Sequence, residues 1–292
     1  MVKCLNDAHG TNWAAYHGDT VSVMAQLPDA SVDFSVYSPP FADLFTYSDS
    51  EADMGNNSGD EQFFEHYRFA VEQIYRLTKP GRLTSVHCKD LPSFKFRHGA
   101  VGLRDFPGDV IRAHTDFGWI YHSRVTVWKD PVTEMQRTKA LGLLHKQIIK
   151  DSSMSRMGLP DYVLTFRKPG ENAEFVAHDR ESFPVDQWQE WASPVWMDIR
   201  QGEVLDKVQA RAPQDEKHIV PLQLDLIRRC LVLWSNPGDT VLSPFMGIGS
   251  EGYCSLKHGR KYIGIELKDS YFKQACRYLA GVEAQPDLLA AE

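Results

Sequence analysis

The sequence lacks any long apolar run. No window approaches the roughly 18 apolar residues that a membrane-spanning helix needs. The first ten residues, MVKCLNDAHG, also lack the apolar core of a secretory signal peptide. These absences predict a cytoplasmic protein with no membrane partner.

Cysteine is scarce and scattered. The chain has five cysteines and no CxxC pair. This pattern argues against a disulfide framework and against a zinc site, and it favours a reducing compartment. We therefore expect no metal centre.

An excess of positive charge is also missing. The formal net charge of −7 does not by itself suggest a nucleic-acid-binding protein. The stretch from Asp43 to Glu65 contains no Lys or Arg. The segment 124–168, in contrast, contains nine Lys and Arg residues and only four Asp and Glu residues. A basic segment in an acidic protein can face phosphates, although a solvated helix surface carries the same charges.

The apolar pattern predicts an α/β domain. Residues 32–37 read as a buried strand, and residues 63–77 have helical apolar spacing that Lys79-Pro80-Gly81 ends. A strand at 83–87 follows. Such a strand–helix–strand unit is typical of a parallel sheet.

The remaining pattern continues this alternation after an irregular middle. Further strands are predicted at 119–128, 161–168, 240–245 and 262–267, and further helices at 222–234, 250–259 and 270–282. Residues 129–215 read as an insertion with a basic, partly helical beginning. We expect a single domain over residues 1–292, built on a doubly wound, mostly parallel sheet.

A glycine-rich turn indicates a nucleoside-containing cofactor. Gly247, Gly249 and Gly252 spell GxGxxG between a strand and a helix, and Glu266 ends the next strand. Glycines allow close approach of the backbone, and the carboxylate can accept ribose hydroxyls. A simple tight turn is the alternative reading. The motif fits both a nicotinamide dinucleotide and S-adenosyl-L-methionine.

The stretch Ser38-Pro39-Pro40-Phe41 favours methyl transfer. Ser38 Oγ and the Pro39 carbonyl can accept two hydrogen bonds from an amino group, and Pro40 fixes the direction of that carbonyl. Phe41 can stack on a base. An activated methyl group needs positioning more than acid–base chemistry, whereas a nicotinamide enzyme gives no reason for this motif. The Pro-Cys motif of ring-carbon methylation is absent from the sequence.

Several segments, in order, resemble the β-class amino-DNA methyltransferases. They are YHGDTVSVMAQLPDASVDFSVYSPPF, KPGRLTSVHCKD, VTVWKDP, PDYVLTFRKPG, VWMDIR, KHIVPLQLDLI, GDTVLSPFMGIGS and YIGIELKDSYFKQA. The chain is similar in particular to solitary, phage- or prophage-type members. The resemblance implies a Rossmann-like methyltransferase fold, S-adenosyl-L-methionine as cofactor, and target recognition by the insertion at 129–215. It further implies double-stranded DNA as partner, base flipping and a homodimer.

The resemblance also implies roles for individual residues. Catalysis is expected of Ser38, Pro39, Pro40 and Phe41. Cofactor binding is expected of Asp19, His218, Pro221, Ser243, Phe245, Gly247, Gly249, Ser250 and Glu266. DNA contacts are expected of Lys129, Arg137, Lys139, Lys146, Lys150 and Arg156. Asp19 can alternatively cap a helix, and His218 can be a structural histidine. His87 is expected to line the cleft without a catalytic role.

Alternatives remain open at this stage. Ser38 at the first motif position favours cytosine-N4, whereas SPPFADLFTYS resembles members that modify adenine-N6, which we slightly prefer. Ser38 and Ser243 replace acids that are common in the family, so a catalytically degenerate DNA-binding protein is a second alternative. A nicotinamide oxidoreductase is a third. The acidic segment 43–65 is hypothesised to be a lid or a subunit contact. Nothing in the sequence resembles a nuclease, so no restriction partner is expected within this chain.

Overall fold

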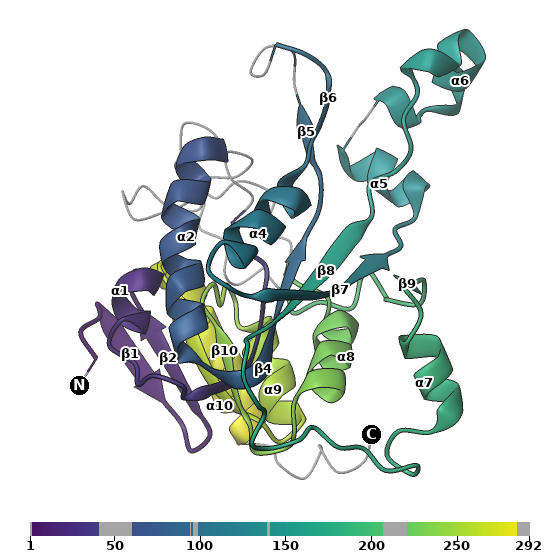
Figure 1. The fold of residues 1–292 in the computed structure, drawn as a ribbon. Coiled ribbons are helices and arrows are strands. Elements are labelled where there is room, and N and C mark those ends of the chain that lie inside the picture. The colour runs from purple at the N-terminus through teal and green to yellow at the C-terminus, as the bar shows by residue number, and fades with distance from the viewer. Residues whose placement is uncertain are drawn as a thin grey trace.

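The computed structural model describes residues 2–40, 60–93, 95, 99–138, 141–206 and 221–284. Within them, one nine-stranded sheet forms the centre of the molecule (Figure 1). In sheet order its strands are β1 (Asn6–His9), β2 (Trp13–His17), β11 (Lys261–Glu266), β10 (Thr240–Ser243), β3 (Val32–Tyr37), β4 (Thr78–Cys88), β8 (Asp161–Arg167), β7 (Ile120–Val127) and β9 (Val195–Trp196). A separate hairpin pairs β5 (Leu91–Ser93) with β6 (Gly102–Arg104).

The strand directions divide the sheet. Strands β2, β11, β10, β3 and β4 are mutually parallel, and β8 pairs antiparallel with both β4 and β7. The predicted α/β fold with a mostly parallel sheet is therefore confirmed. Because the carboxyl ends of the parallel strands meet at one edge, this edge is where a ligand is expected.

Helices cover both faces of the sheet. Helices α1 (Thr20–Met24), α2 (Asp60–Leu77) and α4 (Phe106–Thr115) contribute to one buried apolar cluster. Helices α8 (Leu224–Trp234), α9 (Ser250–Lys257) and α10 (Asp269–Glu283) contribute to the other. No helix among the described residues is long and apolar enough to cross a membrane.

Strand β4 begins earlier than its sequence suggests. The stretch Lys79-Pro80-Gly81, expected to end the preceding helix, lies within the strand, because Thr78 already pairs with Val32 of β3. The pairing changes register between Val32 and Phe34, which accommodates the irregular stretch. The predicted end of the helix at residue 77 is confirmed, since α2 ends at Leu77. Only the start of the strand differs from residue 83, because pairing with β3 extends β4 back to Thr78.

The segment between β7 and β8 stands away from the sheet (Figure 1). This segment, called the arm below, covers residues 128–160. It contains α5 (Pro131–Thr138), the short 3-10 helices η3 (Leu141–Leu143) and η4 (Ser152–Met154), and α6 (His145–Asp151). The arm is thus a long connection between β7 and β8, two adjacent antiparallel strands.

The remainder of the insertion packs against α8. Trp191, at the end of α7 (Val185–Trp191), and Trp196 are buried, and the Trp196 indole donates to the Trp191 carbonyl at 3.0 Å. Arg229 lies over both rings and forms an ion pair with Asp198. These contacts make the second half of the insertion part of the core.

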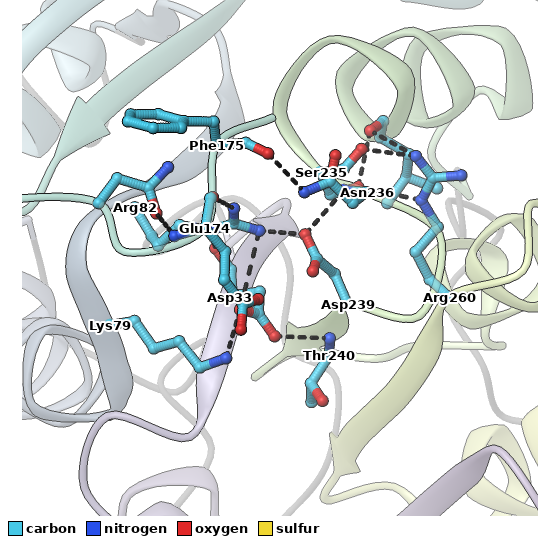
Figure 2. Close-up of polar contacts among 12 residues, drawn as sticks. Asp33, Lys79, Arg82, Glu174, Phe175, Ser235, Asn236, Asp239, Thr240 and Arg260 are labelled. Atoms are coloured by element: carbon cyan, nitrogen blue, oxygen red, sulfur yellow. Dashed lines mark hydrogen bonds and ion pairs between the residues drawn. The ribbon is translucent and has the colours of Figure 1, made fainter. Parts of the chain in front are cut away.

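A network of buried charges closes the amino ends of the strands (Figure 2). Asp33 accepts from Lys79 Nζ at 2.6 Å and from the Thr240 N–H at 2.9 Å. Arg82 pairs with Asp239 and donates to the Glu174 carbonyl at 3.0 Å. Asp33, Glu174 and Asp239 lie closely enough to hold a cation, but Lys79 and Arg82 already form ion pairs with the two buried aspartates. This end of the sheet is therefore held together by ion pairs.

Candidate active site

The opposite, carboxyl edge of the sheet gathers the predicted motifs. Ser38 follows β3, His87 lies near the end of β4, and Glu266 ends β11. Gly247 lies in the turn between β10 and α9. The parallel topology thus brings the two motifs found in the sequence to one edge.

The glycine turn and Glu266 form one hydrogen-bonded unit. Gly247 has a φ of 55°, and a Cβ built on it meets nothing within 4 Å. Its N–H donates to Glu266 Oε2 at 2.8 Å, and the Lys268 N–H donates to Oε1 at 2.8 Å. The carboxylate is therefore fixed against the turn, and the space in front of Gly247 is open.

Gly252 has a different purpose from Gly247. A Cβ at this position would lie 2.5 Å from the Tyr262 ring and 2.6 Å from Leu279. This glycine therefore lets α9 pack closely on β11 and α10. It supports the fold of the motif and does not face a ligand.

Asp19 and Thr20 connect α1 to this turn. Asp19 is the N-cap of α1 and accepts from the Ser22 N–H at 2.8 Å, which confirms the alternative reading of this residue. Thr20 Oγ1 donates to the Pro244 carbonyl at 2.7 Å. Asp19 thus lies next to a residue that contacts the glycine turn, and its cofactor contact remains a prediction.

The other predicted cofactor residues are distributed around the turn. Ser243 ends β10 and is buried, and Ser250 begins α9 and is buried. The Phe245 ring packs against Tyr37 with ring centroids 5.8 Å apart. Gly249 is the N-cap of α9, with a φ of 91°. Pro221 is buried just before α8.

Some predicted site residues lie outside the described residues. These are Phe41, His218 and Lys139, together with the side chain of Arg137 and most of the acidic segment 43–65. Their predicted roles stay predictions.

Glu251 is a residue that sequence reasoning missed. It lies in the first turn of α9, directly after Ser250, and is 4% exposed. Burial, together with the nearby Glu266 charge, raises the pKa of Glu251 to about 8. An acid in the first turn of a helix is usually read as a favourable dipole partner, so the sequence carried no signal of this burial.

A polar chain leads away from Ser38. Ser38 Oγ lies 3.2 Å from His87 Nδ1, and His87 Nε2 lies 3.0 Å from Asp161 Oδ2. Lys129 Nζ contacts the same Asp161 oxygen. Burial opposes ionisation of Asp161, but His87 and Lys129 outweigh it and hold the pKa of this carboxyl below its usual range. His87 therefore contacts the candidate catalytic serine, which goes beyond the expected lining of a cleft.

The basic residues predicted to contact DNA divide into two groups. Lys146 and Lys150 are exposed on α6. Arg156 pairs with Glu134 at 3.5 Å, and Lys129 pairs with the buried Asp161 at the base of the arm. Lys129 therefore has its charge paired within the protein, and its contact with DNA stays a prediction.

Comparisons with known proteins agree with this geometry. The family model described as DNA methylase, of the N6/N4 type, matches residues 32–277. The chain is 30% identical over 276 residues to the DNA adenine methyltransferase YhdJ of Escherichia coli strain K12, covering 90% of this chain and 81% of that protein.

Solved structures share the fold. TTHA0409 of Thermus thermophilus, assigned as a DNA modification methylase and solved with S-adenosyl-L-methionine, superposes with a TM-score of 0.67 at 22% identity. The match covers 92% of this chain and 93% of that one. The cytosine-N4-specific PvuII DNA methyltransferase superposes with a TM-score of 0.65 at 15% identity, covering 97% and 94%.

These matches resolve the broader alternatives. The family match extends across both the SPPF stretch and the glycine turn, which leaves the nicotinamide oxidoreductase without support. The same match supports S-adenosyl-L-methionine as methyl donor and DNA as partner. The chain belongs to the DNA methylase family of N6/N4 amino-methyltransferases.

Proposed function

We propose that this protein transfers a methyl group from S-adenosyl-L-methionine to the N6 amino nitrogen of adenine in a short sequence of double-stranded DNA. The observation that carries the proposal is the placement of Ser38 and of the Gly247–Glu266 unit at the same edge of the sheet. A methyl donor held by the turn and an amino group held by Ser38 would then meet. The adenine preference is supported by the Escherichia coli relative, which is named as an adenine methyltransferase.

The turn residues fit such a cofactor. S-adenosyl-L-methionine supplies a methyl group already activated on a sulfonium. Glu266 accepts the backbone N–H groups of Gly247 and Lys268, which holds its carboxylate at the turn where ribose hydroxyls of the cofactor would bind. The open space at Gly247 gives the backbone access to the ligand. Asp19, Pro221, Ser243, Phe245, Gly249 and Ser250 surround or support this position, and we propose that they complete the cofactor site.

The target amino group would meet two acceptors. Ser38 Oγ and the Pro39 carbonyl follow directly after β3, and the Pro40 ring limits the directions that the Pro39 carbonyl can take. Two acceptors on the two N–H bonds favour a pyramidal nitrogen, whose lone pair can attack the methyl carbon. To reach this position, the base must leave the duplex.

Cytosine-N4 is the second candidate target. It is favoured by the serine at the first position of the SPPF motif, where an acid or asparagine is more usual for adenine. Both bases present an exocyclic amino group beside a ring nitrogen. The acceptors at Ser38 and Pro39 could therefore serve either base.

Expression in a methylation-free host tests the function and the target together. Genomic sequencing that distinguishes N6-methyladenine from N4-methylcytosine should reveal one modified motif carrying N6-methyladenine. N4-methylcytosine alone would exclude the adenine proposal and leave the methyltransferase intact. No modified base, from a folded protein whose melting temperature rises with S-adenosyl-L-methionine, would favour the degenerate DNA-binding alternative.

Ser38→Ala provides the catalytic control. We expect it to retain DNA binding and to lose most methyl incorporation, because one of the two acceptors is removed. Equal incorporation by the variant and the parent protein would show that Ser38 has no catalytic role.

We also propose that the protein acts as a homodimer and that residues 129–215 recognise the target sequence. A two-fold dimer suits a palindromic site. Light scattering of the free protein tests the dimer. Deletion of residues 49–59 tests whether the acidic segment is a lid or a subunit contact, because unchanged assembly and unchanged cofactor binding would exclude both.

A further inference from the structure

We propose that methyl transfer releases a proton from the target amino group and that this proton reaches His87 by way of the Ser38 hydroxyl. Asp161 holds His87 in place for this step. The inference rests on the proposed amino-methyl transfer and deepens it. It is carried by the continuous chain of contacts from Ser38 Oγ through His87 to the ion pair of Asp161 and Lys129.

The geometry selects one arrangement of the histidine. His87 Nε2 lies 3.0 Å from Asp161 Oδ2, and Asp161 is 1% exposed. The negative charge of this buried carboxylate favours the proton on the nearer ring nitrogen, Nε2. The other nitrogen, Nδ1, is then the acceptor in neutral His87, and it faces Ser38 Oγ at 3.2 Å. The serine hydroxyl therefore donates to His87, which turns the serine lone pairs toward the position proposed for the target amine.

The step balances without a further reactant. The bond between the amino nitrogen and the methyl carbon forms while the sulfonium–methyl bond breaks, and the sulfonium becomes a neutral thioether. The nitrogen then carries an extra proton. Ser38 Oγ takes that proton as its own hydroxyl proton moves to His87 Nδ1. The resulting imidazolium is stabilised by the Asp161 carboxylate and later loses its proton to water.

The charges that surround His87 suit this role. Asp161, from β8, is the anion in contact with the ring, and Lys129, at the base of the arm, contacts that anion. Ser38, after β3, brings no charge. Cys88, the next residue of β4, is fully buried, and burial raises the pKa of its thiol well above the ordinary value, so that it stays neutral. Among these described neighbours, only Asp161 can directly stabilise a charged His87.

His87→Asn separates proton transfer from positioning. The Asn Oδ1 can take the place of Nδ1 and accept from Ser38, but it cannot take up the proton. The measurement is the single-turnover methylation rate at saturating cofactor and DNA, from about pH 5.5 to pH 9. His122→Asn is the matched control, because exposed His122 on β7 also has its Nδ1 3.2 Å from a serine hydroxyl, that of Ser123.

The wild-type protein and His122→Asn should lose rate as the pH falls, about tenfold per unit below a midpoint, because protonated His87 cannot accept. His87→Asn should be at least about tenfold slower at pH 8 and nearly independent of pH over this range. Its affinities for cofactor and DNA should be unchanged. A pH profile of His87→Asn parallel to that of the wild type would overturn the proposal while leaving the methyltransferase function in place.

A spectroscopic measurement tests the same arrangement without turnover. Nitrogen-15 NMR of the histidine rings, assigned with His87→Asn, should show neutral His87 protonated at Nε2, and Asp161→Asn should reduce this preference. A wild-type His87 protonated at Nδ1 would overturn the proposal. Because this measurement does not need DNA methylation, it distinguishes failure of the relay from failure of the proposed function.

Discussion

Thr20 Oγ1 donates a 2.7 Å hydrogen bond to the carbonyl of Pro244, so the first helix of the chain is joined directly to the glycine turn. The threonine belongs to α1, near the amino terminus, and the proline follows β10, near the other end of the chain. The glycine turn is therefore supported by a residue far from it in sequence.

Thr20→Val should weaken both the fold and the cofactor site. The buried Pro244 carbonyl would lose its partner, and we expect the free energy of unfolding to fall by about 1–3 kcal/mol. Cofactor affinity, measured by calorimetry, should fall several-fold. Thr115→Val is the control, since the exposed Thr115 hydroxyl bonds only within its own helix. An equal effect of both substitutions would contradict a special role for Thr20.

Glu266→Gln should reduce cofactor affinity by about ten- to a hundredfold, corresponding to about 1.5–3 kcal/mol. The glutamine places an amide NH2 against one of the two N–H groups that the carboxylate now accepts. Titration calorimetry with S-adenosyl-L-methionine measures the loss. Glu72→Gln, on the exposed side of α2, should bind normally. Unaltered binding by Glu266→Gln would remove Glu266 from the cofactor site.

Glu251→Gln should stabilise the cofactor-free protein in a pH-dependent way. The carboxyl ionises near 4.5 when unfolded and near 8 when folded, so the native state holds more protons than the unfolded state between these values. The free energy of unfolding of the parent protein therefore falls as the pH rises through this window. The glutamine avoids this loss.

Chemical denaturation at pH 5 and pH 7.5 checks this prediction. The gain in free energy of unfolding from the substitution should be about 3 kcal/mol larger at pH 7.5 than at pH 5. Glu65→Gln, on the exposed side of α2, should show no such difference between the two pH values. If Glu251→Gln changed the free energy of unfolding equally at both pH values, Glu251 would not have the raised pKa that burial gives it here.

Asp33→Ala should destabilise the amino edge of the sheet. Asp33 is 4% exposed and accepts from Lys79 and Thr240, so its loss leaves two part-buried donors without this acceptor (Figure 2). We expect the free energy of unfolding, measured by chemical denaturation, to fall by about 3 kcal/mol. Asp29→Ala removes the exposed carboxylate that pairs with Arg76 and should cost less than about 1 kcal/mol. Similar losses in the two variants would argue against the buried network.

Lys146→Ala combined with Lys150→Ala should weaken DNA binding. Both lysines are exposed on α6, in the arm. If each contacts a phosphate, the slope of the logarithm of the binding constant against the logarithm of the salt concentration should become shallower by about 2. Lys261→Ala combined with Lys273→Ala is a charge-matched control outside the arm. An unchanged slope for the α6 variant would place the DNA elsewhere.

The elements with a strong local pattern were predictable from the sequence. The strand at Val32–Tyr37 is correct to the residue, and helices α8, α9 and α10 agree within two residues. Strand β1 was missed because Asn6–His9 is polar and largely exposed, so it shows no alternating apolar pattern. The local pattern also could not show that β8 runs antiparallel to β4, since strand pairing is a contact between distant segments.

The candidate site was predictable only in part. Ser38, Gly247 and Glu266 could be found because their motifs are local and contain proline, glycine and an acid at a strand end. The partnership of His87 with Asp161 could not be found, because it depends on the register that places Cys88 opposite Tyr162. In the sequence, Asp161 is only one of four acidic residues in the basic segment 124–168, which gives no sign of a partner. Glu251 was missed because burial by packing is not visible in a single helical turn.

The ion pair between Lys129 and Asp161 has a mechanical consequence. Lys129 stands where the chain leaves the sheet for the arm, and Asp161 stands where it returns, so the pair closes the stem of the arm. Asp161 is also the carboxylate that contacts His87. A bound duplex that displaced the arm would therefore also displace Asp161, whose carboxylate contacts the histidine next to Ser38. If the arm binds the duplex, as proposed, an ill-fitting sequence would slow methyl transfer through Asp161 as well as weaken binding.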